Sequence, residues 1–101
     1  MKLYHASPIE TEESIKEVGL FPTNCGTKAH NGESLQGRGL MGIYGFVSLD
    51  DAVSFVQDNG SEGYAIFAFD VTDDAETMID PEYEGESIFV VTDDPIAARL
   101  A

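Results

Sequence analysis

Positive charge is what this sequence has least of. Its 101 residues include five Lys and Arg against nineteen Asp and Glu, which gives a formal net charge of −14. Direct nucleic-acid binding is therefore not expected, because that affinity depends largely on basic side chains that neutralise phosphates. Two interpretations stay open: acid that keeps the protein soluble and monomeric, and acid that faces a basic, nucleic-acid-binding partner.

Cysteine and long apolar runs are also scarce. Cys25 stands alone, so the chain can form neither an internal disulfide nor a thiolate metal site. No apolar run has the length of a signal peptide or of a membrane span. Hydrophobic residues make up 43% of the chain and charged residues 24%, as in ordinary globular domains. We therefore expect one soluble, cytoplasmic domain over residues 1–101, without a membrane partner.

The opening segment, residues 2–8, predicts a strand with a candidate binding residue. Alternation along the strand turns Leu3 and His5 to one side and Tyr4 and Ala6 to the other. The strand ends at Pro8, which donates no backbone hydrogen bond. A histidine near a strand end lies where binding residues gather, and a purely structural histidine is the alternative.

Strands outnumber helices in the rest of the chain. A helix is expected over 12–18, capped by Thr11, ended by Gly19 and packed through Ile15, Val18 and Leu20. A second helix should follow a cap at Ser48, Asp50 or Asp51, bury Ala52, Phe55 and Val56, and end at 59–60. Strands are expected at 44–49, 63–71, 78–79 and 87–92, and one helical turn at 96–100. The pattern indicates an α+β domain of five or six strands and two short helices.

Residues 24–42 form a glycine-rich stretch with little periodicity. Lys28, His30 and Arg38 lie there, three of the seven residues that can carry positive charge. Long stretches of this kind in a compact domain are often lids or binding loops. A disordered surface segment is the alternative interpretation.

Two acidic residues, Glu84 and Glu86, directly precede the last strong strand. Carboxylates at the mouth of a cleft can bind ribose hydroxyls and stabilise an oxocarbenium ion. With nineteen acids in the chain, such a pair also arises by chance. A metal site is not expected, because His5 and His30 are not at ligand spacing and no calcium-loop pattern occurs.

In its order of elements, the chain resembles the ADP-ribosyltransferase superfamily, especially small bacterial and phage members and the related RNA 2′-phosphotransferases. The segments that carry the resemblance are LYHASP (3–8), IKEVGLFP (15–22), GIYGFVSL (42–49) with Ala52 and Phe55 after it, and EGESIFVV (84–91). Together they cover most of the chain in the family's order, and the opening segment is the most distinctive.

The resemblance implies a split, strongly bent, mostly antiparallel sheet with NAD held in the cleft and no metal. His5 would hydrogen-bond a ribose hydroxyl, and an aromatic residue would stack on the nicotinamide. Glu86 would orient the nicotinamide ribose and stabilise the oxocarbenium ion, and Glu84 would activate the acceptor. The residues expected to contact NAD are His5, Ala6, Ser7, Tyr44, Phe46 and Arg38.

Some assignments within the resemblance stay open. Tyr44, Phe46 and Ser48 are all candidates for the aromatic or second-motif position, and Glu82 competes with Glu86 if the register shifts. The implied activity is transfer of ADP-ribose from NAD to a macromolecular acceptor, expected to be a protein, in the host cytoplasm if the chain is phage-encoded. The alternative is a non-catalytic acidic protein that binds or inhibits a basic, nucleic-acid-binding partner. Phosphate transfer from RNA is disfavoured because the chain has few basic residues.

Overall fold

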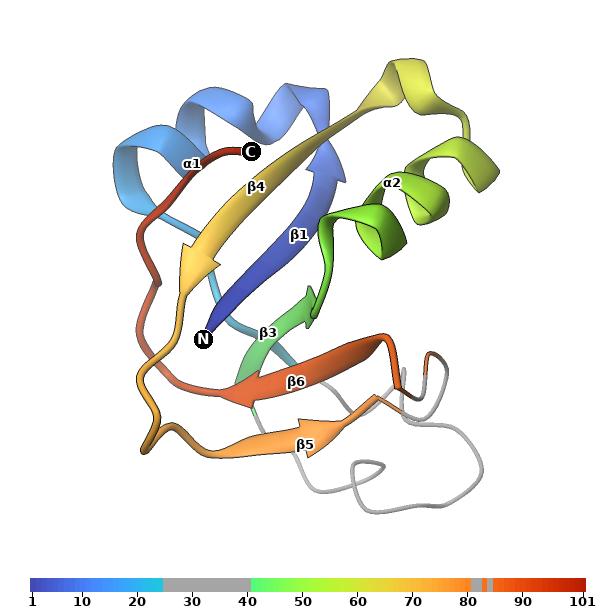
Figure 1. Ribbon diagram of the computed structural model, residues 1–101. Helices are drawn as coiled ribbons and strands as arrows, with labels where there is room; N and C mark the ends of the chain where they lie inside the picture. The colour runs from blue at the N-terminus through green and yellow to red at the C-terminus, as the bar shows by residue number, and fades with distance from the viewer. Residues whose placement is uncertain (25–40, 81–82, 84) are drawn as a thin grey trace.

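The structure, a computed structural model, describes residues 1–24, 41–80, 83 and 85–101 (Figure 1). Six strands form one antiparallel sheet in the order β5-β6-β3-β1-β4-β7, and β2 pairs with β3. The strands are β1 (Lys2–Pro8), β2 (Thr23–Asn24), β3 (Met41–Phe46), β4 (Tyr64–Asp70), β5 (Thr77–Ile79), β6 (Ser87–Val91) and β7 (Ala98–Leu100). The helices are α1 (Glu12–Val18) and α2 (Leu49–Asp58). The expected α+β class with two short helices is confirmed.

The sheet is divided between β1 and β3. β1 pairs with β4 along its whole length, from Lys2↔Asp70 to Pro8↔Tyr64. Its register with β3 is the single pair Tyr4↔Phe46, whereas β3 pairs with β6 from Gly42↔Val91 to Phe46↔Ser87. Figure 1 shows β5 and β6 running across the direction of β1 and β4. The expected split of the sheet therefore lies between β1 and β3, where little backbone pairing remains, and each half beside it is well paired.

The two faces of the sheet carry different side chains. Leu3, Phe67 and Phe69 are fully buried in one core, together with Ile15 of α1. Gly45 lies on this face, since a Cβ added there would come within 2.9 Å of Leu3 Cβ and 2.8 Å of Phe69 Cζ. Its neighbour Phe46 points to the opposite face, because successive side chains alternate along a strand.

The helix α1 has the predicted bounds but not all of the predicted contacts. It ends at Gly19, whose φ of +91° is a conformation that glycine adopts without strain. Thr11 occupies the predicted cap position, but its side chain accepts no capping hydrogen bond, and its hydroxyl donates to the carbonyl of Pro8 at 2.6 Å. Val18 was expected in the buried stripe and is 46% exposed, whereas Ile15 and Leu20 are buried as predicted.

The helix α2 follows its sequence signals closely. Ser48 is its cap and accepts a hydrogen bond from the backbone N–H of Asp51 at 3.2 Å. Ala52 and Val56 are buried, and Phe55 is half-buried. In the part of the chain that the structure describes, no helix is long and apolar enough to cross a membrane.

Three predicted boundaries are corrected. The strand predicted at 44–49 is β3, which begins at Met41 and ends at Phe46 because Ser48 caps α2. The tail predicted as a helical turn forms β7, whose pairing with β4 includes Phe67↔Leu100. The open edge of β4 overrides the helix propensity of the tail. The glycine-rich stretch 24–42 contributes to β2 and β3 at its ends, and residues 25–40 lie outside the described residues.

Candidate functional site

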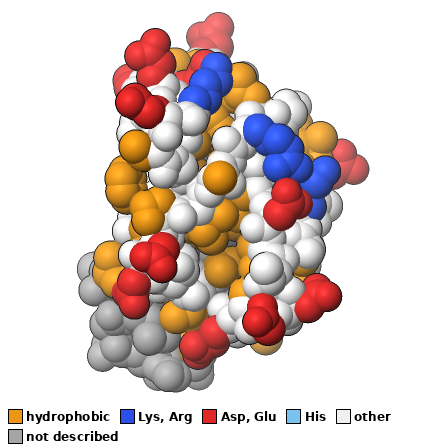
Figure 2. Space-filling model, turned by 90° about the vertical axis from the view of Figure 1, so that its left-hand side faces the viewer, with side chains coloured by type: hydrophobic (Ala, Val, Ile, Leu, Met, Phe, Trp, Pro, Cys, Tyr) orange, Lys and Arg blue, Asp and Glu red, His pale blue; other side chains and the backbone are white. Residues whose placement is uncertain are grey.

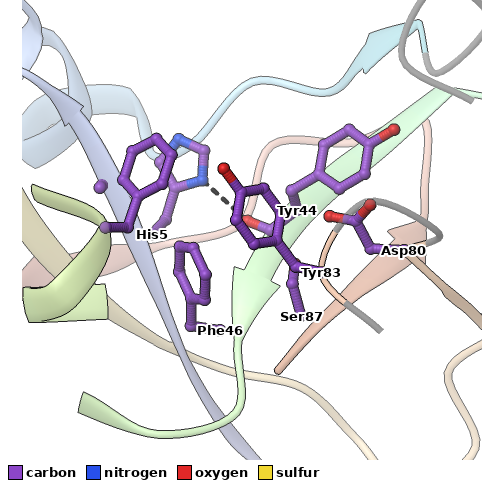
Figure 3. Close-up of a pocket in the computed structure, with 8 residues that line it drawn as sticks. His5, Tyr44, Phe46, Asp80, Tyr83 and Ser87 are labelled. Atoms are coloured by element: carbon purple, nitrogen blue, oxygen red, sulfur yellow. Dashed lines mark hydrogen bonds between the residues drawn. The ribbon is translucent and has the colours of Figure 1, made fainter. Parts of the chain in front are cut away.

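A cavity of about 240 Å³ lies beside the split of the sheet, on the face to which Phe46 points (Figure 3). We call it the aromatic cavity, because four of the eight described residues that line it are aromatic. The eight residues come from β1, β3, α2, the residue after β5, the segment that leads into β6 and the first residue of β6. The lining residues are His5, Ala6, Tyr44, Phe46, Phe55, Asp80, Tyr83 and Ser87.

Three of the rings pack against one another. The ring centroid of Phe46 lies 5.5 Å from that of Phe55 and 5.7 Å from that of Tyr83. Phe55 and Tyr83 are 5.9 Å apart. Tilted and edge-on pairs at these distances are favourable beyond the burial of area, so the cluster holds its rings in place. Such rings offer flat surfaces for a planar ligand.

His5 bridges the gap where β1 and β3 separate. Its Nδ1 lies 2.8 Å from the carbonyl oxygen of Tyr44. A carbonyl only accepts hydrogen bonds, so Nδ1 carries the proton and donates, and Nε2 is left as an acceptor in the neutral ring. Burial lowers the pKa of His5 below its ordinary value of 6.5, and the bond to Tyr44 opposes this in part. The imidazole is therefore predominantly neutral at pH 7.

Asp80 supplies a carboxylate to the aromatic cavity. Its exposed fraction is 6%, and among the described residues it is the one buried acidic side chain. Its backbone N–H donates to the carbonyl of Ser87 at 3.4 Å, and its carbonyl accepts from the N–H of Tyr83 at 3.2 Å. These two bonds fix the turn between β5 and β6 that places the side chain.

A second cavity of about 230 Å³ lies on the opposite face of the sheet, where Ser7, Ile15 and Ile43 point. It shares His5 and Tyr44 with the aromatic cavity. We call it the hydroxyl cavity, because four Ser and Thr side chains line it. Its described lining residues are His5, Ser7, Thr11, Ser14, Ile15, Gly19, Leu20, Phe21, Thr23, Ile43 and Tyr44.

The hydroxyl of Ser7 is held by a short chain of hydrogen bonds. The Thr11 hydroxyl has one proton, which it donates to the Pro8 carbonyl at 2.6 Å. The contact of 2.7 Å between Ser7 Oγ and Thr11 Oγ1 must then use the Ser7 proton. Ser7 therefore has only acceptor capacity left for a ligand in the hydroxyl cavity.

The structure brings together most of the predicted NAD-contacting residues that it describes. His5, Ala6, Tyr44 and Phe46 line the aromatic cavity, and Ser7 lines the hydroxyl cavity.

Of the predicted catalytic residues, the structure describes only Glu86. This residue is exposed and lines neither cavity, and its carbonyl accepts from Val47 N–H at 2.8 Å. Ser48 caps α2 and also lines neither cavity. Two predicted site residues, Arg38 and Glu84, lie outside the described residues. The same holds for the loop residues Lys28 and His30 and for Glu82, the alternative to Glu86.

Four residues that line the aromatic cavity were not predicted as site residues, and one of them, Phe55, was expected only in the buried face of a helix. Asp80 stands before Pro81, which favours extended backbone and the end of a strand, and this signal marked the turn but not the direction of the side chain. Tyr83 lies between two glutamates, and no periodicity there marks its ring as a lining residue. Ser87 was read only as the start of a strand. Their convergence depends on how β5, β6 and β3 pair.

The described residues contain no group of three or more His, Cys, Asp or Glu side chains that could bind a metal ion. No family model, curated protein or solved structure matches the chain. The chemistry of the two cavities is therefore the basis for the function proposed below.

Proposed function

We propose that the protein binds NAD at the aromatic cavity and transfers its ADP-ribose to a macromolecular acceptor. One observation carries the proposal: four aromatic side chains and a histidine bonded to the Tyr44 carbonyl line a single cavity where the sheet splits. The nicotinamide ring would pack against the rings of Tyr44 and Phe46, whose flat faces suit a planar heterocycle.

The proton on Nδ1 of His5 defines the contact on the other ring nitrogen. Nε2 accepts a hydrogen bond, so a ribose hydroxyl that donates is the matching group. The cavity, at about 240 Å³, is smaller than the roughly 300–1,000 Å³ typical of pockets for drug-sized ligands. It suits the nicotinamide and part of its ribose. The remainder of the dinucleotide would extend beyond it, and the hydroxyl cavity on the far side of His5 offers polar partners.

Transfer requires that the bond between the ribose C1′ and the nicotinamide nitrogen breaks. Nicotinamide leaves with the bonding electrons, the ribose becomes an oxocarbenium ion, and the acceptor attacks C1′ and loses a proton. A carboxylate near the ribose stabilises that cation. Glu86 is our candidate for this role, because it resembles the family's glutamate and, although it lies outside the cavity, stands next to Ser87 of the cavity wall in the sequence. The cavity supports binding directly, whereas Glu86 supports transfer through its place in the chain.

A paired assay tests the proposal. Wild type and Glu86→Gln are incubated with labelled NAD and a lysate as the source of acceptors, and label transfer and nicotinamide release are measured. We expect Glu86→Gln to lower both by about 100-fold or more while NAD binding is retained. Glu62→Gln, at an exposed acid, is the matched control and should behave as wild type.

The outcomes separate the two halves of the proposal. Equal transfer and release by wild type and Glu86→Gln would remove Glu86 from the mechanism. If wild type neither labels an acceptor nor releases nicotinamide, transfer is rejected. If it also fails to bind NAD, the whole proposal is rejected.

The acidic surface favours a second candidate, a non-catalytic protein that binds a basic partner. Figure 2 shows acidic side chains around the margin of the face that carries α1 and β7, with hydrophobic and a few Lys and Arg side chains between them. With a net charge of −14, a basic nucleic-acid-binding protein is the complementary partner. Its complex should weaken steeply with salt and should survive His5→Ala. Failure to retain any such protein at low ionic strength would reject this candidate.

A further inference from the structure

The serines Ser7 and Ser87 are both buried, but their hydroxyls differ in hydrogen bonding. Ser7 Oγ lies 2.7 Å from Thr11 Oγ1, to which it donates. Ser87 is 3% exposed, and its hydroxyl makes no hydrogen bond to any residue that the structure describes. Most buried hydroxyls are hydrogen-bonded, so the hydroxyl of Ser87 calls for an explanation.

Ser87 belongs to the wall of the aromatic cavity (Figure 3). It is the first residue of β6 and pairs with Phe46 of β3, so the two side chains lie side by side on the same face of the sheet. The ladder between β3 and β6 fixes its backbone. Because the side chain is only a methylene and a hydroxyl, the hydroxyl lies at the cavity wall beside Phe46.

The chemistry of a hydroxyl defines the ligand group that suits it. A serine hydroxyl can both donate and accept, and a carboxamide also does both. Phe46 and Phe55, with ring centroids 5.5 Å apart, offer apolar surface to a planar ring, whose edge can then carry a substituent to the hydroxyl. A ring without such a substituent would displace water from the hydroxyl and offer no hydrogen bond in return.

We propose that the Ser87 hydroxyl makes the aromatic cavity selective for a planar ring that carries a carboxamide. This inference rests on the proposed function and deepens it, because the nicotinamide of NAD is such a ring. Ser87 is therefore a specificity-determining residue. Its hydroxyl binds the carboxamide, while the aromatic side chains pack against the ring.

Two small probes test the selectivity on the whole chain. Nicotinamide and 3-methylpyridine share the pyridine ring and are uncharged at pH 7.5, but only nicotinamide carries the carboxamide. We expect wild type to bind nicotinamide about tenfold more tightly, which is the effect of one hydrogen bond in a partly desolvated site. Affinities are read from amide chemical shifts in two-dimensional NMR titrations.

Substitution isolates the hydroxyl. Ser87→Ala should weaken the binding of nicotinamide about tenfold and leave the affinity for 3-methylpyridine nearly unchanged. Ser54→Ala, at an exposed serine of α2 that lines neither cavity, is the matched control and should keep the preference. Should Ser87→Ala fold poorly, nuclear Overhauser contacts between the Ser87 methylene and the ring protons beside the carboxamide are measured in wild type. Their absence from the saturated complex would overturn the contact.

The titrations separate the selectivity from the proposed function. A preference for nicotinamide that Ser87→Ala retains, or that Ser54→Ala also loses, would overturn the role of Ser87. Equal binding of both probes to wild type would overturn selectivity for the carboxamide while ring binding stands. If wild type binds neither probe but does bind NAD, the selectivity is overturned and NAD binding is not. If nicotinamide binds through Ser87 and NAD does not bind, the role of Ser87 stands and the proposed function is rejected.

Discussion

The two cavities share His5 and Tyr44 but offer a ligand opposite kinds of chemistry. The aromatic cavity has four rings and a buried carboxylate, whereas the hydroxyl cavity has four Ser and Thr side chains. Two successive residues of β1 point to opposite faces, so that Ala6 lines the aromatic cavity and Ser7 lines the hydroxyl cavity. His5 reaches both because β1 and β3 are paired only at Tyr4↔Phe46. The separation of β1 from β3 thus creates a candidate site that no single sequence motif defines.

The largest predicted loss of stability comes from a substitution that disrupts the packing between the two halves of the sheet. Gly45→Ala places a Cβ within 2.9 Å of Leu3 Cβ and 2.8 Å of Phe69 Cζ, both in the buried core. We expect a loss of about 2 kcal/mol or more in the free energy of unfolding, measured in urea.

Gly63→Ala is the control for Gly45→Ala. No atom lies within 4 Å of the added Cβ, so its effect should stay within about 0.5 kcal/mol. Equal losses in the two variants would contradict the close approach of β3 to the Leu3 face.

The aromatic cavity depends on Phe55, the ring of α2 that contacts Phe46, Tyr83 and Tyr64. Phe55→Ala should cost about 2 kcal/mol, less than for a fully buried phenylalanine, and should weaken binding of NAD severely. Val53→Ala, on the same helix and 36% exposed, should change the free energy of unfolding little and leave NAD binding intact. NAD binding that survives in Phe55→Ala would place the ligand elsewhere.

Lowering the pH should destabilise the folded protein through His5, the histidine that lines both cavities. Folded His5 has a lowered pKa, so between its unfolded value near 6.5 and the folded value the unfolded chain binds more protons. The stability of wild type should therefore fall as pH drops below about 6.5, by at most about 1.4 kcal/mol per pH unit.

The matched variant for the pH experiment is His5→Gln. It lacks the titrating group, while His30 is present in both proteins and cancels from the comparison. The free energy of unfolding is measured from pH 7.5 to 5.5. Identical slopes for wild type and His5→Gln would show that His5 is not held neutral by burial.

The smallest effect belongs to the hydroxyl cavity. Ser7→Ala removes the hydroxyl that donates to Thr11 at 2.7 Å and should cost about 1 kcal/mol. Ser14→Ala, at an exposed serine of the same cavity, should cost within about 0.5 kcal/mol. Thermal or urea unfolding distinguishes them, and a null effect of Ser7→Ala would mean that the bond to Thr11 is not maintained in solution.

Local signals allowed much of the fold to be predicted. The stop at Gly19, the strand β4 and a cap at Ser48, Asp50 or Asp51 depend only on nearby residues and were predicted, and the structure selects Ser48 as the cap. The helical turn predicted for the tail around Leu100 was wrong, because these residues pair with β4, which lies far away in the sequence. Propensity gives way where a distant strand edge is open.

The candidate site was predictable only where it depends on one strand. His5 at a strand end was singled out from the sequence, but its bond to Tyr44 depends on where β1 and β3 part. The placement of Glu86 depends on register. Ser87 pairs with Phe46, and both line the aromatic cavity, so the adjacent Glu86 falls outside it. A register shift of one residue would turn every side chain of the strand to the opposite face of the sheet. No sequence pattern in this chain determines that register.

The most direct test of NAD binding at the split is a titration of the isotopically labelled protein with NAD, followed by amide chemical shifts. We predict saturable shifts that cluster at His5, Tyr44, Phe46, Phe55 and Ser87 and that Phe55→Ala weakens. An absence of shifts at millimolar NAD, or shifts confined to β7 and α1, would contradict NAD binding at the aromatic cavity.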